Sequence, residues 1–242
     1  HIMALPKITT SQHELVIPST GKTIKYRPFL VKEEKVLIIA LESQDAKQIT
    51  NAVKQVLKEC VITRGVKIED LSSFDIEYLF LNVRGKSVGE TIDLIITCGD
   101  DGVTQIPVTV PIDEILVETN PEHNQEIKLN SEYTLKMKYP SMSQFISANF
   151  GLTDDENEVE KSFDIIADCI DLVYDAENVY AGSETSKKEK IEWIESLTSE
   201  QFQMIEKFFN TMPRLTYTVQ VTNPNTKKEN TVVLEGLADF FA

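Results

Sequence analysis

Hydrophobic residues recur along the chain at two spacings, one typical of strands and one typical of helices. Strand-like runs occur in four pairs, at 13–17 with 23–26, 91–98 with 104–110, 126–129 with 133–139, and 215–222 with 231–234. Turn-forming residues lie between the members of each pair, as Gly99-Asp100-Asp101-Gly102 does in the second pair. The pattern therefore predicts short antiparallel β-hairpins.

Spacings of three and four predict helices at about 31–43, 45–62, 72–85, 141–150, 154–174, 187–197 and 198–212, with a short one at 237–241. The second half of 31–43 is apolar on nearly all sides, which predicts that it is buried. The helix that begins at Ser72 or Ser73 and ends near Gly85 is apolar on two sides and is expected at the centre. Thr198 and Gln201 form a capping-box pattern.

The order of these elements predicts an α+β fold. Short antiparallel β-hairpins are expected to pack on helices, with a mainly helical segment in the C-terminal half, at about 141–212. We expect one compact unit with two lobes, residues 3–140 and 141–242. His1 and Ile2, which precede Met3, are interpreted as the remnant of a cloning tag.

The net charge of −15 is unevenly distributed over the 242 residues. Residues 1–70 carry +3, whereas residues 71–150 carry −7 and residues 151–210 carry −11. Nucleic acid is not expected as a partner, because binding to phosphates needs a concentrated basic surface. No apolar run approaches the ~18 residues of a membrane helix, and no secretory signal is apparent, so no membrane association is expected. An acidic middle suits protein–protein contact.

The sequence contains few residues in arrangements that could form a catalytic or metal-binding site. Cys60, Cys98 and Cys169 form no CxxC pair, and their odd number argues against a disulfide framework, so buried thiols in a reducing compartment are expected. His13 and His123 lie in separate segments and are interpreted as solvated. No phosphate-binding loop, nucleophile elbow or set of four zinc ligands is found. We expect no enzymatic activity, no metal and no cofactor.

Asp164, Asp168, Asp171 and Asp175 recur at spacings of four, three and four within the predicted helix 154–174. In a helix this spacing places four carboxylates along one face, without interleaved lysines. Such a stripe is either an ordinary solvated face or a docking site for a basic partner surface.

Three segments carry a family resemblance, namely Lys25-Tyr26-Arg27-Pro28-Phe29-Leu30-Val31-Lys32-Glu33-Glu34-Lys35, residues 74–81 with 84–90, and residues 234–241. In these segments the chain resembles the baseplate hub assembly proteins of T-even-type, contractile-tail bacteriophages. The resemblance implies a role in building the baseplate hub, as a chaperone-like factor or as a minor structural component. It implies other hub and tail proteins as partners, in the host cytoplasm during assembly or in the baseplate of the virion tail.

Two of these segments contain candidate partner-binding residues. Tyr26-Arg27-Pro28-Phe29 is an aromatic and basic cluster of the kind enriched at binding hot spots, and it also fits a rigid corner between a strand and a helix. At the C-terminus, Phe240 and Phe241 are either an interface or a clamp on the last hairpin. The acidic helix and the N-terminal corner are the two candidate contact surfaces.

The sequence therefore predicts a non-enzymatic phage baseplate hub assembly protein that binds other hub or tail subunits. The alternative is a generic intracellular protein–protein adaptor domain, for which the same surfaces would serve. A hydrolase with paired carboxylates is a third hypothesis, and it requires a concave pocket that holds carboxyl groups with shifted pKa values.

Overall fold

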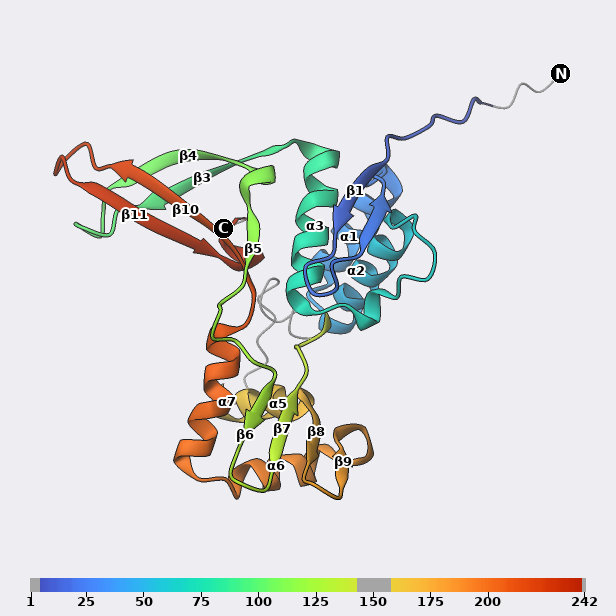
Figure 1. Cartoon of the computed structure of the whole chain (residues 1–242). Coiled ribbons are helices and arrows are strands. Elements are labelled where there is room, and N and C mark those ends of the chain that lie inside the picture. The colour runs from blue at the N-terminus through green and yellow to red at the C-terminus, as the bar shows by residue number, and fades with distance from the viewer. Residues whose placement is uncertain (1–4, 143–157, 241–242) are drawn as a thin grey trace.

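The computed structural model describes residues 5–142 and 158–240 and confirms the α+β fold (Figure 1). Helices lie on one side of a larger part and two long hairpins on the other, above a smaller part made of strands and helices. We call residues 5–118 with 214–240 the main body, and residues 119–142 with 158–213 the inserted unit.

The main body begins with β1 (His13–Val16), β2 (Thr23–Tyr26), α1 (Val31–Ser43) and α2 (Ala46–Cys60). The two strands form the predicted antiparallel pair, and Tyr26 also bridges to Val61 after α2. Asp45 caps α2 by accepting the N–H of Gln48 at 2.8 Å. The apolar stripe of α2 is buried as predicted, through Ile49, Val53, Val56, Leu57 and Cys60.

The prediction that the second half of α1 is buried is wrong. Glu33 and Ala40 are the buried residues of this helix, whereas Ile38 and Ile39 are 56% and 55% exposed. The reason is that α2 packs against one side of α1, and no other described element packs extensively on its outer face. An apolar sequence favours burial, but burial requires a neighbour.

Helix α3 (Ser73–Val88) is central, as predicted, and it is buried on several sides. Ser72 and Asp75 form a capping box at its start. The helix does not end at Gly85 but continues to Val88. Inside the helix, Gly85 makes room for Ile112: a Cβ atom at Gly85 would lie 2.7 Å from Ile112 Cδ1.

Two hairpins complete the main body, β3 (Thr91–Thr97) with β4 (Gln105–Pro111), and β10 (Arg214–Thr222) with β11 (Glu229–Glu235). The short strand β5 (Leu116–Glu118) pairs with the start of β10, and α8 (Gly236–Asp239) follows β11. One hydrophobic core joins these hairpins to α2 and α3, and it includes Ile92, Leu94, Ile96, Val110, Leu215, Val219, Leu234 and Leu237.

The tips of the two hairpins are joined by hydrogen bonds. The buried Asn223 side chain donates from Nδ2 to Asp100 Oδ1 and Asp101 Oδ2, both at 2.9 Å. Asp100 N–H in turn donates to Asn230 Oδ1 at 3.0 Å. These bonds hold the carboxylates in their charged form and lower the pKa of Asp100, the Thr226 hydroxyl contributing most. The turns of the β3–β4 and β10–β11 hairpins, which the sequence predicts as local features, thus bind to each other although they lie far apart in the chain.

The inserted unit is a four-stranded antiparallel sheet with three helices. The strands are β6 (Glu126–Lys128), β7 (Thr134–Met137), β8 (Ile170–Tyr174) and β9 (Val179–Ala181), and the helices are α5 (Glu158–Asp168), α6 (Lys187–Glu195) and α7 (Ser199–Thr211). Thr198 and Gln201 form the predicted capping box of α7. No helix among residues 5–142 and 158–240 is both long and apolar enough to span a membrane.

The predicted helix at 154–174 is wrong in its second half, and its first residues lie outside the described part. Helix α5 ends at Asp168, and Ile170–Tyr174 forms strand β8 between β7 and β9. The apolar spacing of this segment fits a helix, but its neighbours on both sides satisfy its backbone as a strand. The helix predicted at 141–150 also falls on residues that are almost all outside the described ones.

The inserted unit has its own hydrophobic core, formed by Ile127, Leu129, Leu135, Met137, Ile166, Ala167, Cys169, Ile170, Ile194, Ile205 and Phe208. The core of the main body draws residues from both ends of the chain, so the two cores group the segments differently from the lobes 3–140 and 141–242. That division into lobes stays a prediction about how the chain folds.

An aromatic cluster joins the two parts. Phe74 of α3 meets the Tyr139 ring edge-on at 5.0 Å, and Tyr139 stacks with both His123 and Phe208 at 5.7 Å. The interpretation of His123 as a solvated residue is wrong, because its Nδ1 lies 2.9 Å from Thr211 Oγ1 and its Nε2 lies 2.9 Å from the Tyr139 hydroxyl. Burial lowers the pKa of His123 and so favours the neutral ring.

Candidate partner-binding surfaces

The Tyr26–Phe29 corner is built into the main body. Tyr26 is 1% exposed, burial raises its pKa to about 12, and Phe29 is buried against Phe80 with ring centres 5.7 Å apart. Phe29 N–H donates to Ser87 Oγ of α3 at 2.7 Å. The sequence offered two roles for this corner, a rigid connection between strand and helix or a partner-binding site. These contacts match the first role.

Arg27 and Glu33 form a largely buried ion pair at this corner, next to the half-buried Pro28. Their side chains are 13% and 3% exposed, and the guanidinium donates to both carboxylate oxygens at 2.8 and 3.2 Å. Glu33 also accepts the N–H of Leu30 at 2.7 Å, which caps α1. Burial alone would raise the pKa of Glu33, but the hydrogen bonds from Arg27 and Leu30 lower it overall. The pair fixes the start of α1.

The outer face of α1 is the first exposed apolar surface. Val31 is 79% exposed, and Ile38, Ile39 and Leu41 are also exposed. Residues three, four and seven apart lie on the same side of a helix, so Val31, Ile38 and Leu41 share one side of α1 with the exposed charged residues Glu34, Lys35 and Glu42; we call these three apolar residues the stripe. An exposed apolar stripe on a helix is typical of a surface that another protein covers.

The four aspartates do not form the predicted stripe on one helix. Asp164 and Asp168 belong to α5, whereas Asp171 lies on β8 and Asp175 lies in the turn after it. Asp175 Oδ1 accepts the N–H groups of Glu177 and Asn178 at 2.8 and 2.7 Å, which shapes the turn into β9 and lowers the pKa of Asp175.

Lysines also lie closer to these carboxylates than the sequence suggested. Lys187 of α6 lies 3.9 Å from Asp164 and 3.4 Å from Asp168, and Lys136 of β7 lies 3.9 Å from Asp171. All four aspartates nevertheless stay in the inserted unit, and binding of a basic partner to them stays a prediction.

Phe240 is fully buried in the core of the main body, behind α8. Its position matches a clamp on the last hairpin. Phe241, the second aromatic candidate, lies outside the described residues.

No group of three or more His, Cys, Asp or Glu side chains that could hold a metal is found among the described residues. Cys60, Cys98 and Cys169 are free and buried, as predicted.

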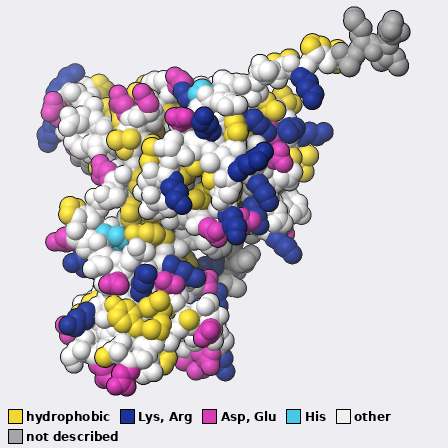
Figure 2. Space-filling view, turned by 45° about the vertical axis from the view of Figure 1, so that its right-hand side comes forward, with side chains coloured by type: hydrophobic (Ala, Val, Ile, Leu, Met, Phe, Trp, Pro, Cys, Tyr) yellow, Lys and Arg dark blue, Asp and Glu magenta, His cyan; other side chains and the backbone are white. Residues whose placement is uncertain are grey.

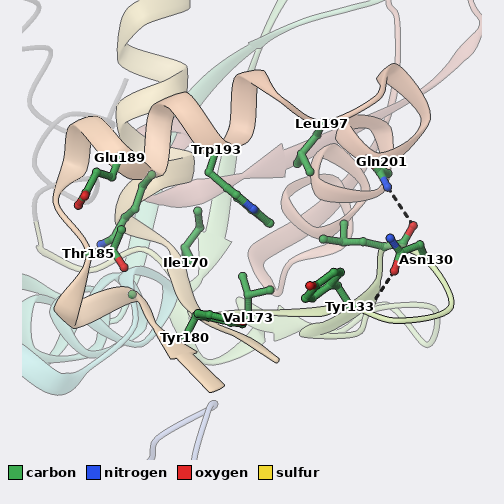
Figure 3. Close-up of a pocket in the computed structure, with 13 residues that line it drawn as sticks. Asn130, Tyr133, Ile170, Val173, Tyr180, Thr185, Glu189, Trp193, Leu197 and Gln201 are labelled. Atoms are coloured by element: carbon green, nitrogen blue, oxygen red, sulfur yellow. Dashed lines mark hydrogen bonds between the residues drawn. The ribbon is translucent and has the colours of Figure 1, made fainter. Parts of the chain in front are cut away.

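The sequence analysis missed a pocket of about 550 Å³ in the inserted unit, which we call the groove (Figure 3). It lies between α6 and one face of the sheet. Trp193 projects into it from α6, opposite Val173 of β8 and Tyr133, which directly precedes β7. The apolar part of its lining consists of Leu129, Tyr133, Ile170, Val173, Tyr180, Trp193 and Leu197.

The shape of the groove depends on Gly182, which follows β9. A Cβ atom at this position would lie 2.2 Å from the carbonyl oxygen of Ile170, so only glycine allows this close approach. The signals of the groove in the sequence are weak. Trp193 is the single tryptophan of the chain, and its partners in the lining are up to 64 residues away, at Leu129.

The comparison with known families decides the identity of the chain at the level of the family. A family model described as T4 bacteriophage base plate protein matches residues 10–242. The chain belongs to this family. The match to the T4 base plate family covers both the main body and the inserted unit, and it confirms the resemblance to T4-type baseplate proteins. Neither a curated protein nor a solved structure matches the chain.

Proposed function

We propose that this T4-type baseplate protein is a non-enzymatic hub assembly protein, which binds other hub or tail subunits while the tail is built. It acts either as a chaperone-like factor in the host cytoplasm or as a minor structural component of the hub. Membership in the baseplate family supports the proposal. The observation that carries it is the exposed apolar face of α1, together with the groove on the opposite part of the molecule.

These two surfaces favour a protein that holds a subunit over one that transforms a substrate. Val31, Ile38 and Leu41 expose apolar surface on one side of α1, and exposed apolar surface on a helix suits contact with another chain. The stripe lies on a helix held firmly at its start by Arg27 and Glu33, so it is presented in a fixed position. A preformed surface loses less conformational entropy when a partner binds.

The test is an affinity pull-down of the tagged protein from phage-infected cells, analysed by mass spectrometry beside purified virions. The expected result is recovery of hub or tail subunits. Their loss with Ile38→Asp/Ile39→Asp, but not with the control Gln55→Ala at an exposed position of the neighbouring helix α2, would assign binding to α1. Presence of the protein in virions would favour a structural component, and absence would favour a transient factor. Recovery of host proteins alone would overturn the proposal in favour of the adaptor.

A further inference from the structure

The groove is lined mainly by apolar side chains, and three of its polar side chains already have hydrogen-bond partners within the protein. Gln201 Nε2 donates to the carbonyl of Leu129 at 3.2 Å, and Thr185 Oγ1 donates to the carbonyl of Ala181 at 3.0 Å. Asn130 Oδ1 accepts the N–H groups of Glu132 and Tyr133 at 2.9 and 2.7 Å. An aromatic or branched aliphatic side chain would bury its surface against Trp193 and the apolar lining around it.

The surroundings of the groove are strongly acidic. Residues 119–213 contain 19 acidic and 8 basic side chains, and the inserted unit, which leaves out residues 143–157, contains 16 acidic and 8 basic side chains and so accounts for −8 of the net charge of −15. Figure 2 shows hydrophobic side chains gathered on this lower part of the molecule, with Asp, Glu and some Lys or Arg side chains around them. An apolar site with an acidic rim attracts a segment that carries positive charge.

The charge is not uniform along the rim. At one end, Glu132 and Asp175 lie close enough to Tyr133 that their negative charge raises the pKa of its hydroxyl, with Glu132 the largest cause. Lys190 of α6 lines the groove together with Glu189, whose carboxylate accepts the N–H of Ser186 at 2.9 Å. The end near Tyr133 is therefore where a cationic group fits best.

We propose that the groove binds a peptide segment of another baseplate subunit, in which an aromatic or branched apolar side chain lies next to lysine or arginine. The apolar side chain enters between Trp193 and Val173, and the cationic group lies near Glu132. Charge complementarity and the apolar lining carry this choice of occupant. The inference rests on the proposed function, because it takes the partner to be a baseplate subunit.

The single tryptophan makes the groove directly observable, since all intrinsic tryptophan fluorescence of the chain comes from Trp193. The probe is a set of overlapping 15-residue peptides that cover the baseplate proteins of the same phage and lack tryptophan. The full-length protein is titrated with each peptide at low and at high salt. We expect a subset with an apolar residue beside Lys or Arg to change the Trp193 emission, with weaker binding at high salt because charge attraction is screened.

Two exposed variants test where these peptides bind. Tyr180→Ala removes an aromatic ring that is 50% exposed on β9 and is expected to weaken binding roughly tenfold. Glu132→Lys is expected to weaken binding several-fold at low salt, with less effect at high salt. The matched controls are Val179→Ala, which changes the exposed neighbour on the same strand but not the lining, and Glu42→Lys on α1. Both controls are expected to bind like the wild type.

The proposal is overturned if no peptide changes the emission of Trp193, or if the peptides that bind lack a cationic residue. Equal effects of Tyr180→Ala and Val179→Ala would also overturn it. A wild-type dimer that Tyr180→Ala converts to a monomer would assign the groove to a second copy of this chain instead. If hub subunits are recovered from infected cells equally well by Tyr180→Ala, the proposed function stands and the groove proposal falls. Failure to recover any tail subunit would overturn both the proposed function and the groove proposal.

Discussion

Helices α1 and α3 have similar apolar patterns, but α3 is buried and one side of α1 is exposed. Both carry apolar residues on more than one side, so sequence alone assigns both to the core. In the structure α3 is enclosed by the hairpins, α8 and the segment that contains Ile112, whereas α1 rests on α2 and leaves Ile38 and Ile39 exposed. Apolar residues thus serve stability in one helix and are available to a partner in the other.

The largest expected effect concerns the anchor of α1. Arg27→Ala removes both guanidinium hydrogen bonds from the buried Glu33 carboxylate and leaves it the exposed Lys32 ammonium at 3.6 Å as a cation, which is expected to lower the free energy of unfolding by about 3 kcal/mol. Urea unfolding followed by circular dichroism measures this change. If Arg27→Ala unfolds like the wild type, the ion pair does not fix the start of α1. The exposed face of α1 would then not be held in a fixed position as the buried face of α3 is.

The same pair predicts a pH dependence. The pKa of Glu33 is lower in the folded protein than its ordinary value of 4.5. Its contribution to stability is therefore fully present above that ordinary value and is lost as the pH falls through the folded-state pKa. Unfolding curves measured between neutral and acidic pH should lose part of this dependence in Glu33→Gln.

A second prediction compares the two apolar faces directly. Leu79→Ala on α3 removes a fully buried side chain and is expected to cost about 2–5 kcal/mol. Ile38→Ala on α1 is expected to change stability by less than about 0.5 kcal/mol, as is usual for surface positions. Chemical denaturation of the two variants gives both numbers. Equal losses would mean that α1 is covered in solution, and the comparison would then fail.

A third prediction concerns the link between the helices. Ser87 Oγ of α3 accepts the N–H of Phe29, just before α1, and donates to the carbonyl of Val83. Ser87→Ala leaves the N–H of Phe29 without this acceptor, which is expected to cost about 1–3 kcal/mol. Asn82→Ala, in which the lost side chain bonds to Tyr78 of its own helix, is the control and should cost less. Thermal unfolding of both variants tests the difference.

The smallest expected effect on stability goes with the largest expected effect on binding. Ile38→Asp places a charge on an exposed position and is expected to leave the free energy of unfolding within about 0.5 kcal/mol of the wild type. It should nevertheless reduce capture of hub subunits from infected cells. Intact capture by a folded Ile38→Asp protein would show that α1 is not a partner surface.

Features set by neighbouring residues could be predicted from the sequence. The cap of α7 at Thr198 and the turn at 99–102 depend on residues a few positions apart, and both occur where the pattern indicated. The stripe of α2 was predictable because one regular face points to one core. The α+β class followed from these local elements.

Features set by distant contacts could not be predicted in this way. Ile170–Tyr174 becomes a strand through its neighbours β7 and β9, and Gly85 lies inside α3, where it makes room for the distant Ile112. His123 finds its partners at Tyr139 and Thr211. The groove was missed for the same reason, since residues between 129 and 201 line it. The apolar pattern identifies residues that avoid water but does not identify which of them a partner will cover.

The point where the inserted unit leaves the main body has an evolutionary consequence. The chain departs after β5 and returns at β10, and these two strands pair with each other, Glu118 opposite Arg214. Residues 119–213 can therefore be lengthened, shortened or exchanged without rethreading the rest of the polypeptide. A segment exchanged at this point during evolution leaves the paired strands in place, but it must supply a partner for Phe74, on which Tyr139 packs.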